Sequence, residues 1–260
     1  MMHPFIIPVR EVRVGNADLG TVGFGGAHPF AVISGPCSVE SAESIVTIAQ
    51  AVRTAGAVML RGGAYKPRTR AGSFQGLGQK ALDYLLEAKR LTGLPVVTEV
   101  IEIAQIDAIA RVADLIQIGA RNMYNYPLLR EVGKLGLPVL LKRGLSATID
   151  EWIGSYEYIG HDRVIFCERG VRGFDPSTRN LLDLTSVPIV QKRTGLPVIV
   201  DPSHGTGRRD LVAPLTFAAE AVGANGVMIE AHVCPDDSIS DADQTISIEQ
   251  LEQIIHHIRR

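Results

Sequence analysis

The stretch T-G-L-P-V-V at residues 92–97 recurs as T-G-L-P-V-I at residues 194–199, and a third copy reads L-G-L-P-V-L at residues 135–140. In each copy a glycine follows an amphipathic segment, which is typical of the end of a helix. A proline and an apolar run follow, which indicates the start of a buried strand. The repeated phrase therefore marks the return from a helix to a strand.

The same alternation extends from Phe30 to the C-terminus. The apolar runs predict strands at Phe30–Ser34, Ala57–Leu60, Pro95–Thr98, Leu115–Ile118, Pro138–Leu141, Val164–Phe166, Pro197–Val200 and Gly226–Ile229. Amphipathic segments predict helices at Ala42–Ala55, Gln79–Thr92, Ile103–Val112, Pro127–Leu135, Ile149–Ile159, Thr178–Arg193, Asp210–Val222 and Ile248–Ile258. Strands that alternate with helices form a parallel sheet, and eight such units in a chain of this length predict a TIM (β/α)8 barrel.

The first 29 residues have a different pattern. Two short β-prone runs, Val9–Val14 and Thr21–Phe24, flank Gly15-Asn16, which we predict to be a turn. Residues 1–29 are therefore predicted to form a short β-hairpin that plugs one end of the barrel. Residues 30–260 are predicted to form the single barrel domain.

Composition restricts the functional class. The chain has 260 residues, 46% of them hydrophobic, with a net charge of -2 and three cysteines. A near-neutral chain is not built for general binding to nucleic acid or to a membrane surface. Neither a secretory leader nor an apolar run long enough to span a bilayer is found, and three cysteines do not form a disulfide framework. We expect a cytoplasmic enzyme that binds small molecules.

A charged or metal-ligating side chain follows every predicted strand. In a TIM barrel the site lies at the C-terminal ends of the strands, so these residues are its candidates. In chain order they are Cys37, Arg61, Glu99, Arg121, Lys142, Glu168 with Arg169, Asp201 with His204, and Glu230. A charged residue after one strand is explained by ordinary solvation, whereas charged or ligating groups after all eight strands indicate a charged ligand at that end of the barrel.

The longest basic segment follows the second predicted strand. Residues 60–76 read L-R-G-G-A-Y-K-P-R-T-R-A-G-S-F-Q-G and contain no acidic residue. Arginine suits carboxylate and phosphate groups, and lysine adds a compact charge. Taken alone, the segment could equally be a solvated basic loop. Six cations collect at the predicted mouth, namely Arg61, Lys66, Arg68, Arg121, Lys142 and Arg169. They would balance two anionic ligands, or one that carries both phosphate and carboxylate.

A second group of strand-end residues has metal-binding chemistry. Three of these residues are Cys37, His204 and Glu230. The fourth metal ligand would be a carboxylate from the last long loop, and the candidates for it are Asp236, Asp237, Asp241 and Asp243. Sulfur, nitrogen and oxygen donors together suit a first-row divalent metal better than magnesium or calcium. The alternative is a small buried Cys37 and a capping His204 with no metal.

Eight motifs in order resemble 3-deoxy-D-arabino-heptulosonate 7-phosphate (DAHP) synthase, in the compact subtype also related to 3-deoxy-octulosonate 8-phosphate synthase. They are G-P-C-S-V-E-S (35–41), R-G-G-A-Y-K-P-R-T (61–69), S-F-Q-G-L-G (73–78), T-E-V (98–100), Q-I-G-A-R-N-M (117–123), K-R-G (142–144), C-E-R-G (167–170) and D-P-S-H-G-T-G-R-R-D-L-V (201–212). K-P-R-T at residues 66–69 favours the heptulosonate enzyme, because octulosonate relatives typically read K-A-N-R-S there.

The resemblance implies that phosphoenolpyruvate (PEP) and D-erythrose 4-phosphate are condensed with water to DAHP and phosphate, the first step of the shikimate pathway. It implies a metal site of Cys37, His204, Glu230 and Asp241, with Mn²⁺ preferred and Fe²⁺, Zn²⁺ or Co²⁺ as alternatives. The implied substrate-binding residues are Arg61, Lys66 and Lys142 for the PEP carboxylate, Arg121 and Arg169 for its phosphate, Arg68 and Thr69 for the aldose phosphate, and Ala120.

The catalytic residues are predicted to be Lys66, Lys142, Glu99 and the metal ligand His204. Neighbouring cations are expected to lower the pKa of Lys66 or Lys142 so that one of them handles protons, with Glu99 beside the attacking water. The resemblance also implies a dimeric or tetrameric homo-oligomer and a barrel without a separate regulatory or chorismate mutase domain.

Three alternatives remain open on sequence. One is the octulosonate synthase, which uses arabinose 5-phosphate. Another is an aldolase that forms a Schiff base at Lys142. The last is a phosphate-binding barrel without catalysis.

Overall fold

A computed structural model describes residues 7–16 and 20–259, and its centre is a closed barrel of eight parallel strands. The strands are β3 (Ala31–Gly35), β4 (Met59–Arg61), β5 (Val96–Val100), β6 (Leu115–Ile118), β7 (Val139–Lys142), β8 (Val164–Glu168), β9 (Val198–Val200) and β10 (Gly226–His232). Each strand pairs with the next, and β10 closes the barrel by pairing with β3 from Gly226↔Ala31 to Glu230↔Gly35. The predicted TIM barrel is confirmed.

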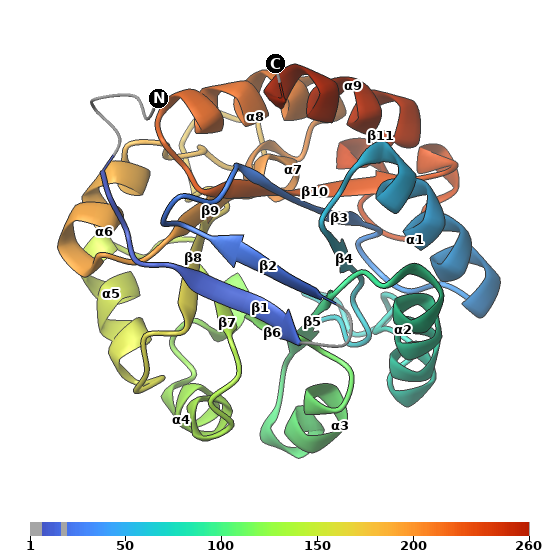
Figure 1. Ribbon diagram of the computed structural model, residues 1–260, viewed down its shortest axis with the longest axis horizontal. Coiled ribbons are helices and arrows are strands. Elements are labelled where there is room, and N and C mark those ends of the chain that lie inside the picture. Colours follow the sequence, from blue (N-terminus) through green and yellow to red (C-terminus); the bar gives the residue numbers. More distant parts are fainter. Residues whose placement is uncertain (1–6, 17–19, 260) are drawn as a thin grey trace.

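Helices surround the barrel (Figure 1). They are α1 (Ala42–Ala55), α2 (Gln79–Thr92), α3 (Ile106–Ala110), α4 (Tyr126–Lys134), α5 (Ile149–Glu157), α6 (Ser186–Thr194), α7 (Pro202–Thr206), α8 (Val212–Ala221) and α9 (Ile248–Ile258). Short 3-10 turns are η1 (Ile103–Gln105), η2 (Ala120–Asn122), η3 (Arg209–Leu211), η4 (Pro235–Asp237) and η5 (Ala242–Gln244), and β11 (Ile246–Ser247) pairs with β10. Gly93 and Gly195 end α2 and α6 in the left-handed conformation, as the repeated phrase predicts. In the described ranges, no helix is both long and apolar enough to span a bilayer.

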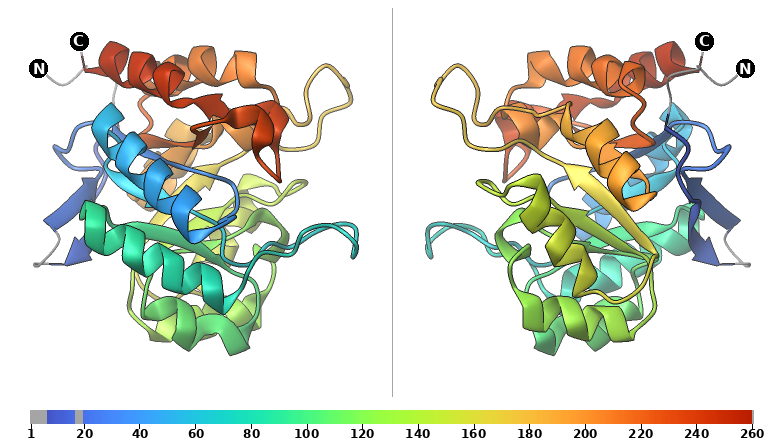
Figure 2. Two further views of the ribbon diagram at one scale, coloured as in Figure 1. Left: turned by 90° about the vertical axis from the view of Figure 1, so that its right-hand side faces the viewer. Right: turned by 90° about the vertical axis from the view of Figure 1, so that its left-hand side faces the viewer.

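The N-terminal hairpin closes one end of the barrel. Strands β1 (Val12–Asn16) and β2 (Gly20–Phe24) pair antiparallel, and Figure 1 shows them lying across the barrel. Val12, Val14 and Phe24 are buried in one apolar cluster with barrel-interior side chains such as Leu115. In Figure 2 the hairpin lies on the side opposite to the two long protruding loops. The hairpin is therefore a plug at the N-terminal ends of the strands, and the other end stays open for a site.

Two local predictions were wrong. Gly15 and Asn16 are not the turn of the hairpin, because they pair with Thr21 and Gly20 in the ladder, and the connection falls on residues outside the described ranges. The helix predicted at Thr178–Arg193 begins only at Ser186.

A hydrogen-bonded bridge and a proline explain the late start of that helix. The backbones of Val171 and Leu181 exchange two hydrogen bonds of 3.0 and 2.8 Å, so the chain before α6 turns back on itself. Pro188 is also confined to the first turn of a helix, since it lacks an N–H and clashes with the preceding turn. The segment 178–185 is consequently a loop at the open end of the barrel.

Candidate active site and metal centre

A cavity of about 320 Å³ lies at the C-terminal end of the barrel. It brings together the predicted substrate and catalytic residues Arg61, Lys66, Arg68, Thr69, Glu99, Ala120, Arg121, Lys142, Arg169 and His204, along with Cys37 and Asp241. Glu230 lies against this cavity and is fully buried. Five charged residues lie within the last three residues of their strands and not in the loops that follow, namely Arg61, Glu99, Lys142, Glu168 and Glu230. The parallel register therefore holds these groups on rigid backbone.

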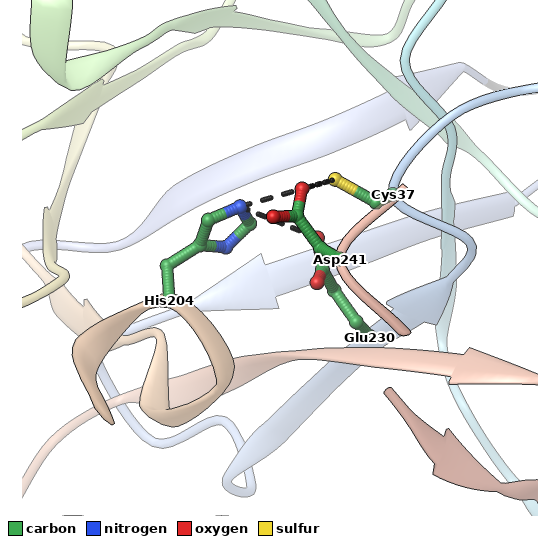
Figure 3. A group of neighbouring side chains, drawn as sticks. All are labelled: Cys37, His204, Glu230 and Asp241. Atoms are coloured by element: carbon green, nitrogen blue, oxygen red, sulfur yellow. Dashed lines mark hydrogen bonds and ion pairs between the residues drawn. The ribbon is translucent and has the colours of Figure 1, made fainter. Parts of the chain in front are cut away.

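The four candidate metal ligands form one cluster (Figure 3). Cys37, His204, Glu230 and Asp241 each offer one ligand atom, and these atoms all lie within 4.8 Å of one another. The Cys37 sulfur is 3.9 Å from His204 Nε2 and 3.1 Å from Asp241 Oδ2. Metal–ligand bonds of roughly 2.0–2.3 Å in tetrahedral geometry separate neighbouring ligand atoms by about 3.3–3.8 Å. The cluster therefore needs little rearrangement to hold one ion.

Two atoms of the cluster, Glu230 Oε1 and His204 Nε2, are suited to a metal. Glu230 Oε1 accepts no hydrogen bond from the described residues, although Arg61 Nη1 lies 3.0 Å away and His204 Nε2 3.3 Å away. Burial lowers the pKa of His204 and outweighs the opposing effect of Asp201. The neutral imidazole is the form that ligates metals. The donor set and its surroundings thus fit a first-row divalent ion.

Asp201 orients the histidine from the side away from the cluster. Its Oδ2 lies 2.8 Å from His204 Nδ1, and its Oδ1 accepts a hydrogen bond of 2.9 Å from the His204 backbone N–H. A carboxylate on Nδ1 holds the tautomer in which Nε2 is free to ligate. Asp201 also forms an ion pair with Lys142. Asp201 is a predicted strand-end residue without a predicted role, although its position three residues before the histidine at the start of α7 is a capping signal.

Asp241 has an unusual backbone conformation. Its φ of 57° and ψ of 33° are left-handed, and among the described residues it is the one non-glycine residue with positive φ. Its carboxylate lies 2.7 Å from Lys66 Nζ and 3.4 Å from Arg179 Nη1. Strained backbone persists only where the surroundings hold it, and it is frequent at functional sites.

The environment of Lys66 contradicts one expectation. Burial alone lowers the pKa of this amine, but the acidic groups Cys37, Glu230 and Asp241 together outweigh burial and raise it. The amine donates hydrogen bonds to Cys37 and Asp241. The predicted lowering by neighbouring cations is wrong for Lys66, because its neighbours are the acidic metal-ligand candidates and not the other cations.

Glu99 has the opposite environment. Burial raises its pKa, and the cations Lys142, Lys66 and Arg61 offset this only in part. Gln117 Nε2 donates a hydrogen bond of 3.1 Å to Glu99 Oε2. Gly119 leaves room for the carboxylate, since a Cβ there would lie 1.9 Å from Glu99 Oε1. The carboxyl group is held in place and shifted toward its protonated form, which suits proton transfer.

The remaining cations are arranged to receive anions. Burial, with a contribution from nearby Arg179, lowers the pKa of Arg169 despite the opposing charge of Asp201. Arg68 Nη1 is buried and has no hydrogen-bond partner among the described residues. Arg121 Nη2 lies 3.5 Å from Thr69 Oγ1 across the cavity. These three arginines line one cavity and, among the described residues, have no carboxylate partner, so they can bind a polyanion.

Two cavity residues were missed by the sequence analysis. Arg179 and Asn180 line the cavity, and Asn180 Nδ2 donates a hydrogen bond of 3.1 Å to the His204 carbonyl. Both were placed inside the helix predicted at Thr178–Arg193. Pro188 was the signal that could have moved that helix start and left them in a strand-end loop.

Comparison with known proteins places the chain among aldol-type synthases. The profile described as "DAHP synthetase I family" matches residues 8–259. A phospho-2-dehydro-3-deoxyheptonate aldolase of Thermotoga maritima is 48% identical over 265 residues, which cover 100% of this chain and 78% of the relative. A 2-dehydro-3-deoxyphosphooctonate aldolase of Rhodopseudomonas palustris is 34% identical over 275 residues, with 98% of this chain and 93% of the relative covered.

Solved structures give the same result. The crystal structure of a phospho-2-dehydro-3-deoxyheptonate aldolase (DAHP synthase) from Thermotoga maritima matches with a TM-score of 0.90 and 44% identity, covering 100% of this chain and 77% of that one. A truncated form of the 3-deoxy-D-arabino-heptulosonate 7-phosphate synthase from the same organism matches with a TM-score of 0.87 and 42% identity, covering 96% and 91%.

Proposed function

The chain belongs to the DAHP synthetase I family, and we propose that the cavity at the open end of its barrel is the active site in which four side chains hold a metal ion. The enzyme condenses PEP with D-erythrose 4-phosphate and water to give DAHP and phosphate, the first step of the shikimate pathway. The observation that carries the proposed site is the cluster of Cys37, His204, Glu230 and Asp241 beside a group of cations in one cavity.

We assign PEP to the inner cations. Arg61, Lys66 and Lys142 would hold the carboxylate, while Arg121 and Arg169 would hold the phosphate; all five line the cavity. Arg61 and Lys142 are almost completely buried, so they present fixed charges that are little screened by water. Fixed charges placed around the reacting groups stabilise charge that develops on them.

The aldose phosphate is assigned to the outer part of the cavity. Thr69 is exposed, and the buried, unpartnered Nη1 of Arg68 lies in the same loop. Ala120, at the start of η2, lines the opposite wall. We add Arg179 to this region, because it lines the cavity and is 45% exposed.

The proposed metal ligands supply a sulfur, a nitrogen and two carboxylates, and Mn²⁺ is the ion we propose, with Fe²⁺, Zn²⁺ or Co²⁺ as alternatives. When bound, a divalent ion supplies Lewis-acid polarisation of an aldehyde oxygen. Cys37, His204 and Glu230 come from three different strand ends, so the barrel itself fixes most of the site.

Glu99 is proposed to move the protons of the reaction. C3 of PEP attacks the aldehyde carbon, water adds at C2, and the bond from C2 to the phosphate oxygen then breaks. Water must lose a proton when it adds, and Glu99 is a buried carboxyl held by Gln117 at the strand ends. The raised pKa of Lys66 keeps this residue charged as an electrostatic partner of the substrate, and Lys142 is held in place by its contact with Asp201.

The octulosonate alternative is not favoured. The sequence at residues 66–69 is K-P-R-T, and the match to a heptonate aldolase at 48% identity exceeds the match to an octonate aldolase at 34%. We further propose that the enzyme is a cytoplasmic homo-oligomer. Exposed apolar side chains on neighbouring elements, Leu86 and Leu91 of α2 and Ile103 of η1, support an interface there.

The test is phosphate release from PEP with either erythrose 4-phosphate or arabinose 5-phosphate as acceptor, before and after chelation. We expect turnover with erythrose 4-phosphate that is lost with a chelator and returns with Mn²⁺. A Cys37→Ala variant should lose the activity as well, because it removes one of four ligands. Release that survives chelation would contradict the metal site, and preference for arabinose 5-phosphate would contradict the assigned acceptor.

A further inference from the structure

Asp241 depends on its loop more than the other proposed ligands do. It lies on the connection between β10 and β11, whereas Glu230 lies on a strand and His204 on a helix. Its left-handed backbone must be held by contacts elsewhere in the connection. The connection is attached to the rest of the barrel on two sides.

Glu40 makes the attachment on one side. It lies three residues after Cys37, and its carboxylate is 16% exposed. Glu40 Oε1 accepts hydrogen bonds of 3.0 Å from the Ile239 backbone N–H and 3.4 Å from the Ser238 hydroxyl. The loop that carries Cys37 thereby holds the two residues just ahead of Ser240 and Asp241.

Two further contacts strengthen this side. The hydroxyls of Ser38 and Ser240 are 2.9 Å apart, and both side chains are buried. Glu40 Oε2 also lies 3.7 Å from Nε2 of His232, the last residue of β10. The two loops are consequently joined side by side next to the metal cluster.

Arg209 makes the attachment on the other side. Its Nη2 donates a hydrogen bond of 2.7 Å to Asp236 and one of 2.9 Å to the carbonyl of Ala242. Arg209 lies in η3, shortly after the helix that carries His204. The connection is thus held both before and after Asp241 by segments that carry other proposed ligands.

We propose that Glu40 is a positioning residue that fixes Asp241 against Cys37 and thereby sets the metal affinity, with Arg209 as the second anchor. This inference rests on the proposed metal site. Glu40 lies outside both the ligand cluster and the lining of the cavity. Its effect acts through the backbone at residues 238–239, which determines where the Asp241 carboxylate lies.

The experiment is a titration of the metal-free, substrate-free protein with Mn²⁺, followed by the electron paramagnetic resonance signal of free Mn²⁺. We expect Glu40→Ala to raise the dissociation constant about 10-fold or more, as losses of groups that orient ligands do. The matched control is Glu43→Ala, an exposed glutamate in the first turn of α1, which should bind Mn²⁺ like the wild type. Glu40→Gln keeps an acceptor for Ile239 N–H and should retain most of the affinity.

Further readouts separate positioning from general stability. The melting temperature of metal-free Glu40→Ala should match that of the wild type, and kcat should recover at saturating Mn²⁺. If Glu40→Ala does not fold, Arg209→Met decides the question, with the neighbouring Arg208→Met as its control because Arg208 contacts Asp210 and not the connection.

A folded Glu40→Ala protein with wild-type Mn²⁺ affinity would overturn the inference, as would equal weakening in Glu43→Ala. Wild-type protein that binds none of Mn²⁺, Fe²⁺, Zn²⁺ and Co²⁺ would overturn the metal site itself, and this inference with it. The two failures are therefore distinguishable.

Discussion

Glu99 shows how one residue acquires a chemical role from its surroundings. Its carboxylate lies among cations, yet burial keeps its pKa above the ordinary value. It fills the space that Gly119 leaves by having no side chain. A strand-end glutamate could be recognised from sequence, but its protonation depends on burial that no spacing reveals.

We expect Glu99→Gln to lower kcat about 100-fold or more with little change in the KM for PEP, because the amide keeps the shape and cannot accept a proton. Steady-state kinetics with PEP and erythrose 4-phosphate measure both constants. Glu102→Gln, three residues further and outside the cavity lining, is the matched control. A wild-type kcat in Glu99→Gln would remove Glu99 from the mechanism.

At the scale of an element, the turn that carries Arg169 is stabilised by a buried charge network. Glu168, the last residue of β8, accepts hydrogen bonds of 2.7 Å from the Gly170 backbone N–H and 3.0 Å from Arg143 Nη1. Arg143 Nη1 also donates to Asp183 Oδ2 at 2.8 Å. The ion pair between Arg143 and Glu168 thus holds together the ends of β7 and β8, next to Lys142 and Arg169. From the sequence, Glu168 was a strand-end charge and Arg143 stood only within the K-R-G motif, and residue spacing did not show that the two side chains contact each other.

This network predicts a pH dependence of stability. Burial alone raises the pKa of Asp183, but hydrogen bonds from Thr185 and Arg143 outweigh it, and the folded-state pKa is lowered from 3.8. The contribution of Asp183 is therefore complete at pH values above the unfolded pKa and is lost as the pH falls through the lower, folded pKa.

We expect Asp183→Asn to be less stable than the wild type in urea at pH 7, with the difference shrinking once the pH falls below the ordinary aspartate pKa of about 3.9. Urea titrations of both proteins across that range measure it. Asp107→Asn, an exposed aspartate on α3, should show no such difference. A stability gap that is constant down to the lowest pH would contradict the assignment to Asp183.

At the scale of the whole molecule, the two ends of the barrel have different roles: the N-terminal ends of the strands are closed by apolar packing, and the C-terminal ends form the proposed site. The hairpin fills the N-terminal end with Val12, Val14 and Phe24, while the cavity occupies the other end. Because the two ends are separate, the left-handed backbone of Asp241 and the cations of the cavity do not disturb the apolar packing at the hairpin end.

We expect Phe24→Ala to lower the free energy of unfolding by about 3 kcal/mol or more, as for other buried aromatic truncations, while kcat/KM changes little. Phe24 is fully buried, whereas Thr21 on the same strand is exposed, so Thr21→Ala is the matched control. Denaturant unfolding and steady-state kinetics on the same preparations measure both effects. If Phe24→Ala lost turnover but kept the free energy of unfolding of the wild type, the hairpin would affect catalysis directly and the proposed division would be wrong.

The sequence by itself determined the eight β/α units, the hairpin and the charged strand ends, since apolar periodicity and helix-ending glycines act locally. A closed parallel barrel then brings strand ends together, so the strand-end residues of the cavity could be named before their geometry was known, whereas Arg179 and Asn180 could not.

Only the tertiary structure decided which charges face each other. Lys66 lies against acidic groups and not among cations, Asp201 holds the His204 ring, and Arg179 joins the site from a segment predicted to be helix. The start of α6 and the two anchors of the Asp241 connection also depend on contacts between distant residues. The physical reason is that pKa, burial and hydrogen bonding depend on distances across the barrel, and residue spacing along the chain does not encode these distances.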